Sequence, residues 1–382
     1  MKQAAETTRN AGIDCLRGLS MLIVLLLHFS LELPHDFAPL GEEVSRRLFE
    51  NGYYGVASFF VISGFLITTN TLRRYGRLSR ISLREFYIMR ASRILPLLFA
   101  FLTLLSVLGY TGVVGFAEQP KHPIPEMLWY AVTFRFNIYF TDHQGWEVFP
   151  WALLWSLSIE EIFYLAFPIL CKFARPPFLA VPIFGAILVY GPYFLTIGGN
   201  SWNYFSCFDL MALGVLTALA ADTGYGRRLS AAFGKPLAVI GIATILYSHQ
   251  DLRLQDHSIL GPLLVGLGAA LVLLACRQEH VGTVPRWLLW LSAPLRAIGR
   301  YSYECYLLHS TILVVLQTQF YEFGDQPYLY LAMTLVAVTV CGAVTGLCFA
   351  EPTNRRLRRW LTGRLPSGSR VDAAFRSAVS RS

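Results

Sequence analysis

Residues 94–116 read ILPLLFAFLTLLSVLGYTGVVGF and contain no charged side chain. A membrane-spanning helix needs about 20 mostly apolar residues, so this stretch is long enough to cross a bilayer. Comparable apolar runs recur along the 382-residue chain, which is 54% hydrophobic and only 15% charged. A soluble chain of this length would need more charge to cover its surface. The sequence therefore predicts an all-α bundle of membrane-spanning helices.

The apolar runs predict about ten spanning helices, with both termini in the cytoplasm. Their expected ranges are 15–34, 53–72, 94–116, 152–171, 178–197, 204–221, 236–248, 258–276, 301–318 and 328–350. Arginine and lysine gather in alternate loops, which the positive-inside rule places in the cytoplasm. This alternation holds only if the short apolar segment 127–140 stays at the outer face without crossing. We expect a membrane domain over residues 1–360 and a disordered, Ser- and Arg-rich tail over residues 361–382.

The charge and cysteine patterns exclude several classes of protein. The net charge of +8 comes from loop arginines and not from a basic stripe on a soluble domain, so no nucleic-acid partner is expected. The seven cysteines lie in or beside apolar runs, without a CxxC motif or a Cys/His cluster, so no metal site is predicted. Since no long soluble segment is present, any chemistry must be built on the spanning helices and their ends.

Arg17 and His28 are ionisable residues at the two ends of the first apolar run. Eleven residues at about 100° each return His28 to the helix face of Arg17, roughly 16 Å further along the axis. Ionisable residues within a membrane are costly and usually face a cavity or a partner. One cavity could then present a cation to the phosphates of a donor and an imidazole, as general base, to a hydroxyl. The competing interpretation is a histidine that only hydrogen-bonds a neighbouring helix.

Arg90 and Arg93 are three residues apart and therefore share a helical face near the cytoplasmic edge of the membrane. Paired guanidinium groups suit phosphate binding. Such arginines also serve simply as positive-inside anchors, and this second interpretation stays open.

Two adjacent carboxylates, Glu160 and Glu161, lie within the predicted span 152–171. Acids in lipid need a partner, and a structural ion pair explains them as well as a direct role does. We also place the following residues as candidates to line a cavity: Asp14, Trp155, Ser156, Ser158, Asp209 and His309. For Asp209 and His309, polar packing between helices is the favoured interpretation.

These segments together resemble the acyltransferase family 3 of membrane-bound O-acyltransferases. Residues 13–28 resemble the Arg-x10-His motif of the family, with Cys15 where a glycine is common, and residues 55–67 (GVASFFVISGFLI) resemble its second-span signature. Four further segments fall in family order: 86–96, 155–160, 301–309 and 350–352. The resemblance covers about residues 10–360, and six motifs in order are far more specific than any one of them.

The resemblance implies transfer of an acyl group, most often acetyl, from cytoplasmic acyl-CoA to a hydroxyl of a glycan or lipid-linked sugar at a bacterial inner membrane. Carried over residue by residue, it makes His28 the catalytic base and Glu160 a supporting residue that pairs with one of the site residues. It assigns the CoA donor to Arg17, Arg90 and Arg93, and it implies no metal. Some family members carry a fused C-terminal hydrolase-like domain. This chain stops soon after its last predicted span, so the stand-alone form is expected.

Two other classes of protein stay open at this point. A transporter of a polar or lipid-linked substrate would also carry polar residues within its spans, although we find no inverted repeat in the sequence. A binding or sensory membrane protein could keep the same scaffold without turnover. The intact Arg17–His28 pair favours the enzyme over this last class.

Overall fold

The computed structural model describes residues 10–31, 47, 49, 51–143, 148–175, 177–198, 203–250, 259–276, 286–319 and 326–363. In these ranges the chain is almost entirely helical, and its β-structure is one isolated bridge between Gln119 and His122. The prediction of an all-α fold is confirmed. The predicted tail lies outside the described residues from position 364 onwards, and residues 361–363 belong to the last helix or follow it directly.

Six helical segments of the described chain are long and apolar enough to cross a membrane. They are α1 (Ala11–Leu31), α3 (Tyr53–Tyr75), α4 (Leu83–Tyr110), α8 with the short helix before it (Phe149–Phe173), α11 (Gly224–Gln250), and α16 with its continuation (Tyr328–Thr362). Four further helices complete the set of predicted spans: α9 (Ala180–Gly198), α10 (Tyr204–Asp222), α12 (Leu260–Ala275) and α15 (Ser302–Gln319). Each predicted span therefore lies on a helix, while the count of ten crossings and the orientation stay predictions.

Two predicted helix starts differ from the structure by more than ten residues. Helix α11 covers 27 residues, far more than the predicted 236–248, because it continues through Pro236. Proline removes one backbone donor from a helix, but it does not have to end it. Helix α4 starts at Leu83, eleven residues before the predicted 94, and Ser82 caps it by accepting from the Glu85 amide. This early start places both arginines of the 90–93 pair inside a regular helix.

The segment 127–140 forms two short helices, α5 (Ile124–Val132) and α6 (Phe136–Asp142). They are nine and seven residues long, about 14 Å and 11 Å at 1.5 Å per residue, so neither can cross a bilayer. Phe134 separates them with a positive φ of 54°. The Phe136 amide then donates to the Ser158 hydroxyl at 3.1 Å, which fixes α6 against α8.

Glycines let the helices that carry the polar residues approach closely. A Cβ on Gly64 of α3 would lie 2.0 Å from the Met211 carbonyl oxygen of α10, and a Cβ on Gly214 of α10 would lie 2.1 Å from the Val61 carbonyl oxygen. Small residues at crossings are typical of helix packing in membranes, where van der Waals contact drives association. The reciprocal pair therefore fixes α3 against α10.

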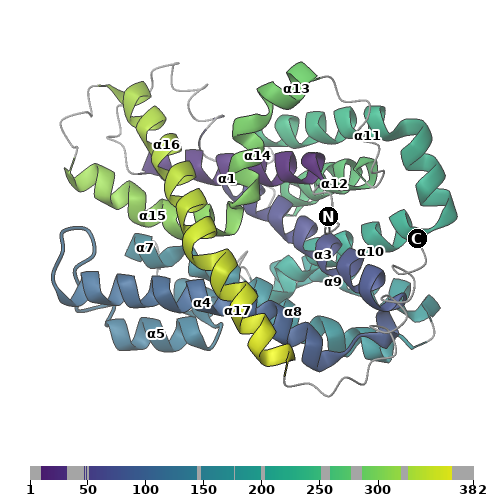
Figure 1. The fold of residues 1–382 in the computed structure, drawn as a ribbon, viewed down its shortest axis with the longest axis horizontal. Coiled ribbons are helices and arrows are strands. Elements are labelled where there is room, and N and C mark those ends of the chain that lie inside the picture. The colour runs from purple at the N-terminus through teal and green to yellow at the C-terminus, as the bar shows by residue number, and fades with distance from the viewer. Residues whose placement is uncertain are drawn as a thin grey trace, which may run out of the picture.

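The described part of the chain ends in a long helical segment that returns across the bundle. Helix α16 (Pro327–Thr345) passes through a π-helical turn (Gly346–Ala350) into α17 (Glu351–Thr362). Figure 1 shows α17, in yellow, running diagonally across α4 and α8. The Ser92 hydroxyl of α4 hydrogen-bonds the Asn354 side chain of α17 at 3.1 Å. Three short helices complete the described fold: α7 (Phe149–Ala152), α13 (Arg286–Leu291) and α14 (Ala293–Arg300).

Candidate active site

A cavity of about 900 Å³ lies inside the bundle, between α1, α3, α4, α8, α15 and α17. Among the described residues its lining contains six arginines but a single carboxylate, that of Glu160. The arginines are Arg17, Arg73, Arg74, Arg90, Arg93 and Arg358. A cavity with this charge balance favours an anionic ligand, and guanidinium groups match the geometry of phosphate oxygens.

The cavity brings together the arginines that the sequence analysis singled out. Arg17 comes from α1, and Arg90 and Arg93 come from consecutive turns of α4. Arg90 and Arg93 therefore lie on one face of α4, as their spacing predicts. Arg73 and Arg74 directly follow the predicted span 53–72, where the sequence predicts a cytoplasmic loop, but the structure places them at the end of α3, where they line the same cavity.

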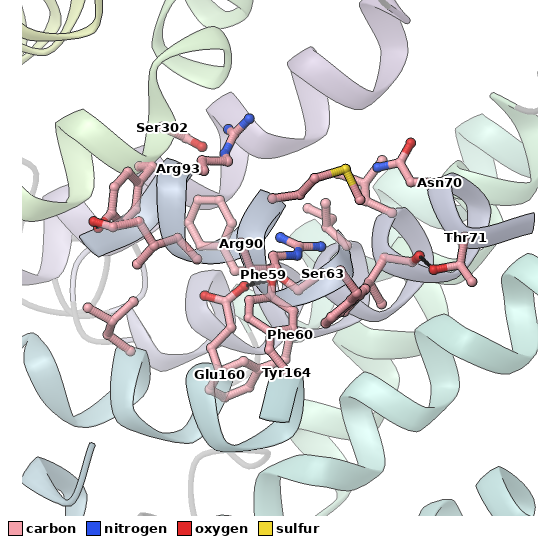
Figure 2. Close-up of a pocket in the computed structure, with 18 of the residues that line it drawn as sticks. Phe59, Phe60, Ser63, Asn70, Thr71, Arg90, Arg93, Glu160, Tyr164 and Ser302 are labelled. Carbon is pink, nitrogen blue, oxygen red and sulfur yellow. Dashed lines mark hydrogen bonds between the residues drawn. The ribbon is translucent and has the colours of Figure 1, made fainter. Parts of the chain in front are cut away.

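Glu160 is held by two hydroxyl groups on the cavity wall. Ser63 of α3 and Tyr164 of α8 both donate to its carboxylate. The guanidinium carbon of Arg90 lies 4.1 Å from the centroid of the Tyr164 ring, a cation–π contact. Figure 2 shows these four side chains gathered on one side of the cavity, apart from Arg93 and Ser302. Arg90 and Glu160 therefore both contact Tyr164, while the predicted pairing of Glu160 with a site residue stays a prediction.

His28 does not line this cavity, and its hydrogen-bond partner is another histidine. Its Nδ1 lies 2.6 Å from Nε2 of His309, and the two rings are nearly parallel with centroids 4.8 Å apart. His309 is fully buried on α15. Residues 28 and 309 are far apart in the sequence, so their pairing depends on the packing of α1 against α15.

Tyr306 stands where the cavity and the histidine pair meet. Its ring lines the cavity, lies 5.5 Å from the His309 ring and meets the Phe59 ring edge-on at 6.3 Å. Its hydroxyl lies 2.6 Å from that of Ser156, a predicted candidate that also lines the cavity. One layer of side chains, Tyr306 with Phe59 and Ser156, therefore adjoins the cavity on one side and His309 on the other.

The other candidates lie away from the described cavity lining. Trp155 stacks on Tyr53 at 6.1 Å, and Ser158 accepts the bond that holds α6. Asp209 accepts from the Leu210 amide at 2.7 Å. The structure buries Asp14 and Glu161, and no hydrogen-bond partner reaches Oε1 of Glu161 in the described part of the chain.

The cavity lining includes further residues that the sequence analysis did not assign to a site, among them Ser63, Tyr164, Asn354 and Arg358. Ser63 stands within the second-span motif, and Tyr164 follows Glu160 by one helical turn, so spacing alone could have suggested both. Asn354 and Arg358 come from α17, where an arginine-rich stretch looks like a cytoplasmic anchor. In the described ranges, no three His, Cys, Asp or Glu side chains are grouped so that they could hold a metal ion.

The fold and the cavity define a multi-pass helical membrane protein with an arginine-lined cavity beside a pair of histidines, of which His309 is buried. Residues 10–346 match the family model described as "Acyltransferase domain" (Acyl_transf_3), so the chain belongs to this family of acyltransferases.

The curated relatives are bacterial O-acetyltransferases by name. O-acetyltransferase OatA of Staphylococcus aureus strain NCTC 8325 is 26% identical over 349 residues, which are 85% of this chain and 54% of the relative. A putative O-acetyltransferase of S. aureus strain COL is 30% identical over 163 residues, 42% of this chain and 24% of the relative. The chain spans about half the length of the OatA proteins it matches. No solved structure matches it significantly.

Proposed function

We propose that the chain is a membrane O-acyltransferase that moves an acyl group, most often acetyl, from acyl-CoA to a hydroxyl of a glycan or glycolipid. The observation that carries this proposal is the adjacency of two features. A cavity lined by six arginines adjoins Tyr306, and Tyr306 adjoins the histidine pair. Membership of the acyltransferase family and the O-acetyltransferase names of the relatives support it.

The donor in this proposal is acyl-CoA, bound by its phosphates. CoA carries a pyrophosphate and a ribose 3′-phosphate, and the arginine lining supplies cations from four helices, α1, α3, α4 and α17. Arg17, Arg90 and Arg93 hold or orient the donor, joined by Arg358. Glu160 supports the cavity wall by accepting hydrogen bonds from Ser63 and Tyr164. The Tyr164 ring in turn holds the guanidinium group of Arg90 through the cation–π contact.

The base in this proposal is His28. As the acceptor oxygen attacks the thioester carbonyl, the hydroxyl proton passes to the imidazole, and a C–O bond forms. When the C–S bond breaks, the thiolate of CoA takes the proton back, so the base is regenerated and CoA leaves as a thiol. A positioned base of this kind typically speeds such a step by about 10² to 10⁴-fold. The layer formed by Tyr306, Phe59 and Ser156 must move aside for the thioester to approach His28.

The acceptor class and the location complete the proposal. We place the chain in a bacterial inner membrane, with the arginine cavity facing the cytoplasm, where acyl-CoA is made. The acceptor is a glycan or a lipid-linked sugar. The Arg- and Lys-rich segments between the predicted spans, which begin with Arg73 and Arg74 at the end of α3, support this orientation.

The test is mass spectrometry of cell glycans with the wild-type chain and with His28→Ala at equal membrane levels. We expect an acyl mass increment on a glycan with the wild type and none with the variant. Purified protein in nanodiscs should also release CoA from acetyl-CoA only when that glycan is present. A transporter would change the distribution of a glycan without adding an acyl group. An increment that survives His28→Ala would remove His28 from the proposed role.

A further inference from the structure

The histidine pair has a defined order of hydrogen bonds. Nδ1 of His309 lies 2.5 Å from the backbone carbonyl oxygen of Tyr306, one helical turn earlier on α15. Nε2 of the same ring lies 2.6 Å from Nδ1 of His28. His309 is 0% exposed, and its ring plane makes an angle of 13° with that of His28, which suits a hydrogen bond between ring nitrogens. Both nitrogens of His309 are therefore used within the protein.

The backbone carbonyl of Tyr306 determines which nitrogen donates and which accepts in each of these hydrogen bonds. A carbonyl oxygen only accepts, so Nδ1 of His309 must carry the proton and donate to Tyr306. In a neutral imidazole the other nitrogen then has no proton, so Nε2 of His309 accepts. Nδ1 of His28 must consequently donate, and Nε2 of His28 is left without a proton. The tautomer of His28 follows from the backbone of a different helix.

A charged His309 would reverse this order, but its surroundings disfavour the charge. In the described residues no carboxylate hydrogen-bonds either ring, and the neighbours of the pair include Phe149, at 5.2 Å from the His28 ring, and Tyr306. A fully buried cation without a counter-ion costs far more than a neutral ring with two good hydrogen bonds. Both forms can make these hydrogen bonds, and the neutral form makes them without burying a charge.

We infer that His309 is a positioning residue that sets the tautomer of His28. His309 accepts a hydrogen bond from the Nδ1–H group of His28. Nε2 of His28 is therefore unprotonated and can take the proton of the acceptor hydroxyl. The inference rests on the proposed role of His28 as general base. It assigns a task to a residue that the sequence analysis placed in helix packing.

The opposite tautomer would not serve as a base. It would carry its proton on Nε2, and its unprotonated nitrogen, Nδ1, would face His309, where no acceptor hydroxyl can approach. His309 also stabilises the imidazolium that forms during transfer, since Nδ1 of His28 then remains a donor to Nε2 of His309. Fixing the tautomer of one imidazole through the hydrogen bond of its other nitrogen is a general device in proteins.

The first test reads the tautomer without any activity assay. Protein with ¹⁵N-labelled histidine in nanodiscs is measured by solid-state NMR, and the His28 signals, among those of eight histidines, are assigned by their loss in His28→Gln. We expect a protonated Nδ1 and a bare Nε2 on His28, with coupling across the N–H···N bond to His309. A protonated Nε2 on His28 would overturn the inference, whatever the enzyme does.

The second test compares three variants on α15. His309→Leu removes the acceptor, and His309→Gln restores a carbonyl oxygen near the position of Nε2. Ser310→Ala is the matched control on the same helix as His309. It removes a buried hydrogen bond from the Ser310 hydroxyl to the Pro150 carbonyl of α7. The readouts are transfer of [¹⁴C]acetyl from acetyl-CoA to the glycan fraction of membrane vesicles, and binding of CoA.

We expect kcat to fall by about 10²-fold in His309→Leu, because the base loses its correct tautomer. His309→Gln should recover at least about tenfold of that loss, and Ser310→Ala should stay within about twofold. All three should bind CoA as the wild type does, which shows that they fold. Full activity in His309→Leu with normal CoA binding would reject the inference. No transfer even by the wild type would count against the proposed function alone, because the NMR result still decides the tautomer.

Discussion

The hydroxyl groups of Ser156 and Tyr306 lie 2.6 Å apart and join α8 to α15 at the edge of the arginine-lined cavity. The Tyr306 ring contacts the His309 ring on one side and the Phe59 ring on another. This hydrogen bond therefore fixes the aromatic layer between the donor cavity and the histidine pair. Such a layer can exclude water from a thioester until an acceptor is present.

Tyr306→Ala should increase the hydrolysis of acetyl-CoA in the absence of an acceptor, by about tenfold, which corresponds to ~1.4 kcal/mol of barrier. Removing the ring opens a path for water between the thioester and His28. Tyr306→Phe keeps the ring and loses only the hydroxyl, so it should hydrolyse acetyl-CoA at close to the wild-type rate. The measurement is release of free CoA thiol from purified protein in nanodiscs. Equal hydrolysis in the alanine and phenylalanine variants would show that the ring does not act as a barrier.

Arg358→Ala should weaken CoA binding, while Arg359→Ala on the same helix should not. Arg358 lines the cavity, whereas its exposed neighbour Arg359 is absent from the lining. A hydrogen bond to a charged group contributes about 1.5–3 kcal/mol, and exposure to salt reduces this, so we expect a three- to tenfold rise in Kd, roughly 0.7–1.4 kcal/mol. Calorimetry with CoA and with 3′-dephospho-CoA would show which phosphate Arg358 contacts. Equal effects of the two substitutions would mean that α17 contributes only its net charge.

The sequence analysis could place Arg17, Arg90 and Arg93 because each follows from the periodicity of one helix. A face shared within a helix is a local property, and membrane burial makes a charged residue informative. The same reasoning could not place Arg358, since its position depends on α17 packing across α4 through the Ser92–Asn354 contact. An arginine that anchors a loop and one that lines a cavity have the same local sequence pattern.

The role of His309 needed the structure for a different reason. The sequence shows a histidine within a span, for which polar packing is the more frequent explanation. Its importance appears only when the Tyr306 carbonyl and the His28 ring are both seen to contact it. The order of donors and acceptors is a property of three groups on two helices, and no spacing rule in the sequence encodes it.

Glu160→Gln should tighten CoA binding at low salt and lower the rate of transfer. Glu160 is the one carboxylate among the described cavity residues, so its replacement removes the one negative charge of that lining. Ser63 and Tyr164 both donate to one carboxylate oxygen of Glu160, and the neutral amide oxygen of a glutamine accepts more weakly, so the wall that carries Arg90 loosens. We expect Kd to fall by about threefold, roughly 0.7 kcal/mol, an effect that salt should screen.

Glu161→Gln is the matched control for this charge effect. Glu161 is the next residue on α8 and is buried, but it does not line the cavity. Its substitution should leave CoA binding unchanged when titrated by the same calorimetry at two salt concentrations. Tighter binding in both variants would show that the effect comes from the net charge of the helix and not from the cavity wall.

Gly299→Ala should destabilise the protein by displacing α1, the helix that carries Arg17 and His28. A Cβ on Gly299 would lie 1.8 Å from the Asp14 carbonyl oxygen of α1, and a Cβ on Gly18 would lie 2.0 Å from the Leu295 carbonyl oxygen of α14. Backbone atoms cannot yield as a flexible side chain can, so α1 and α14 must separate. Overpacking of this kind costs about 1–3 kcal/mol. We therefore expect a lower midpoint of thermal unfolding in detergent and a loss of acetyl transfer.

Gly185→Ala on α9 separates this steric effect from the general effect of replacing a helical glycine. No atom lies within 4 Å of a Cβ built on Gly185, so alanine fits there without a clash. Alanine favours the helix over glycine by up to about 1 kcal/mol, so this variant should unfold at the wild-type temperature or slightly above it. If Gly299→Ala unfolded at the same temperature as Gly185→Ala and kept full transfer, close contact between α1 and α14 would not be what positions Arg17 and His28. A lower unfolding temperature and lower transfer in Gly299→Ala alone would tie the geometry of the site to this crossing.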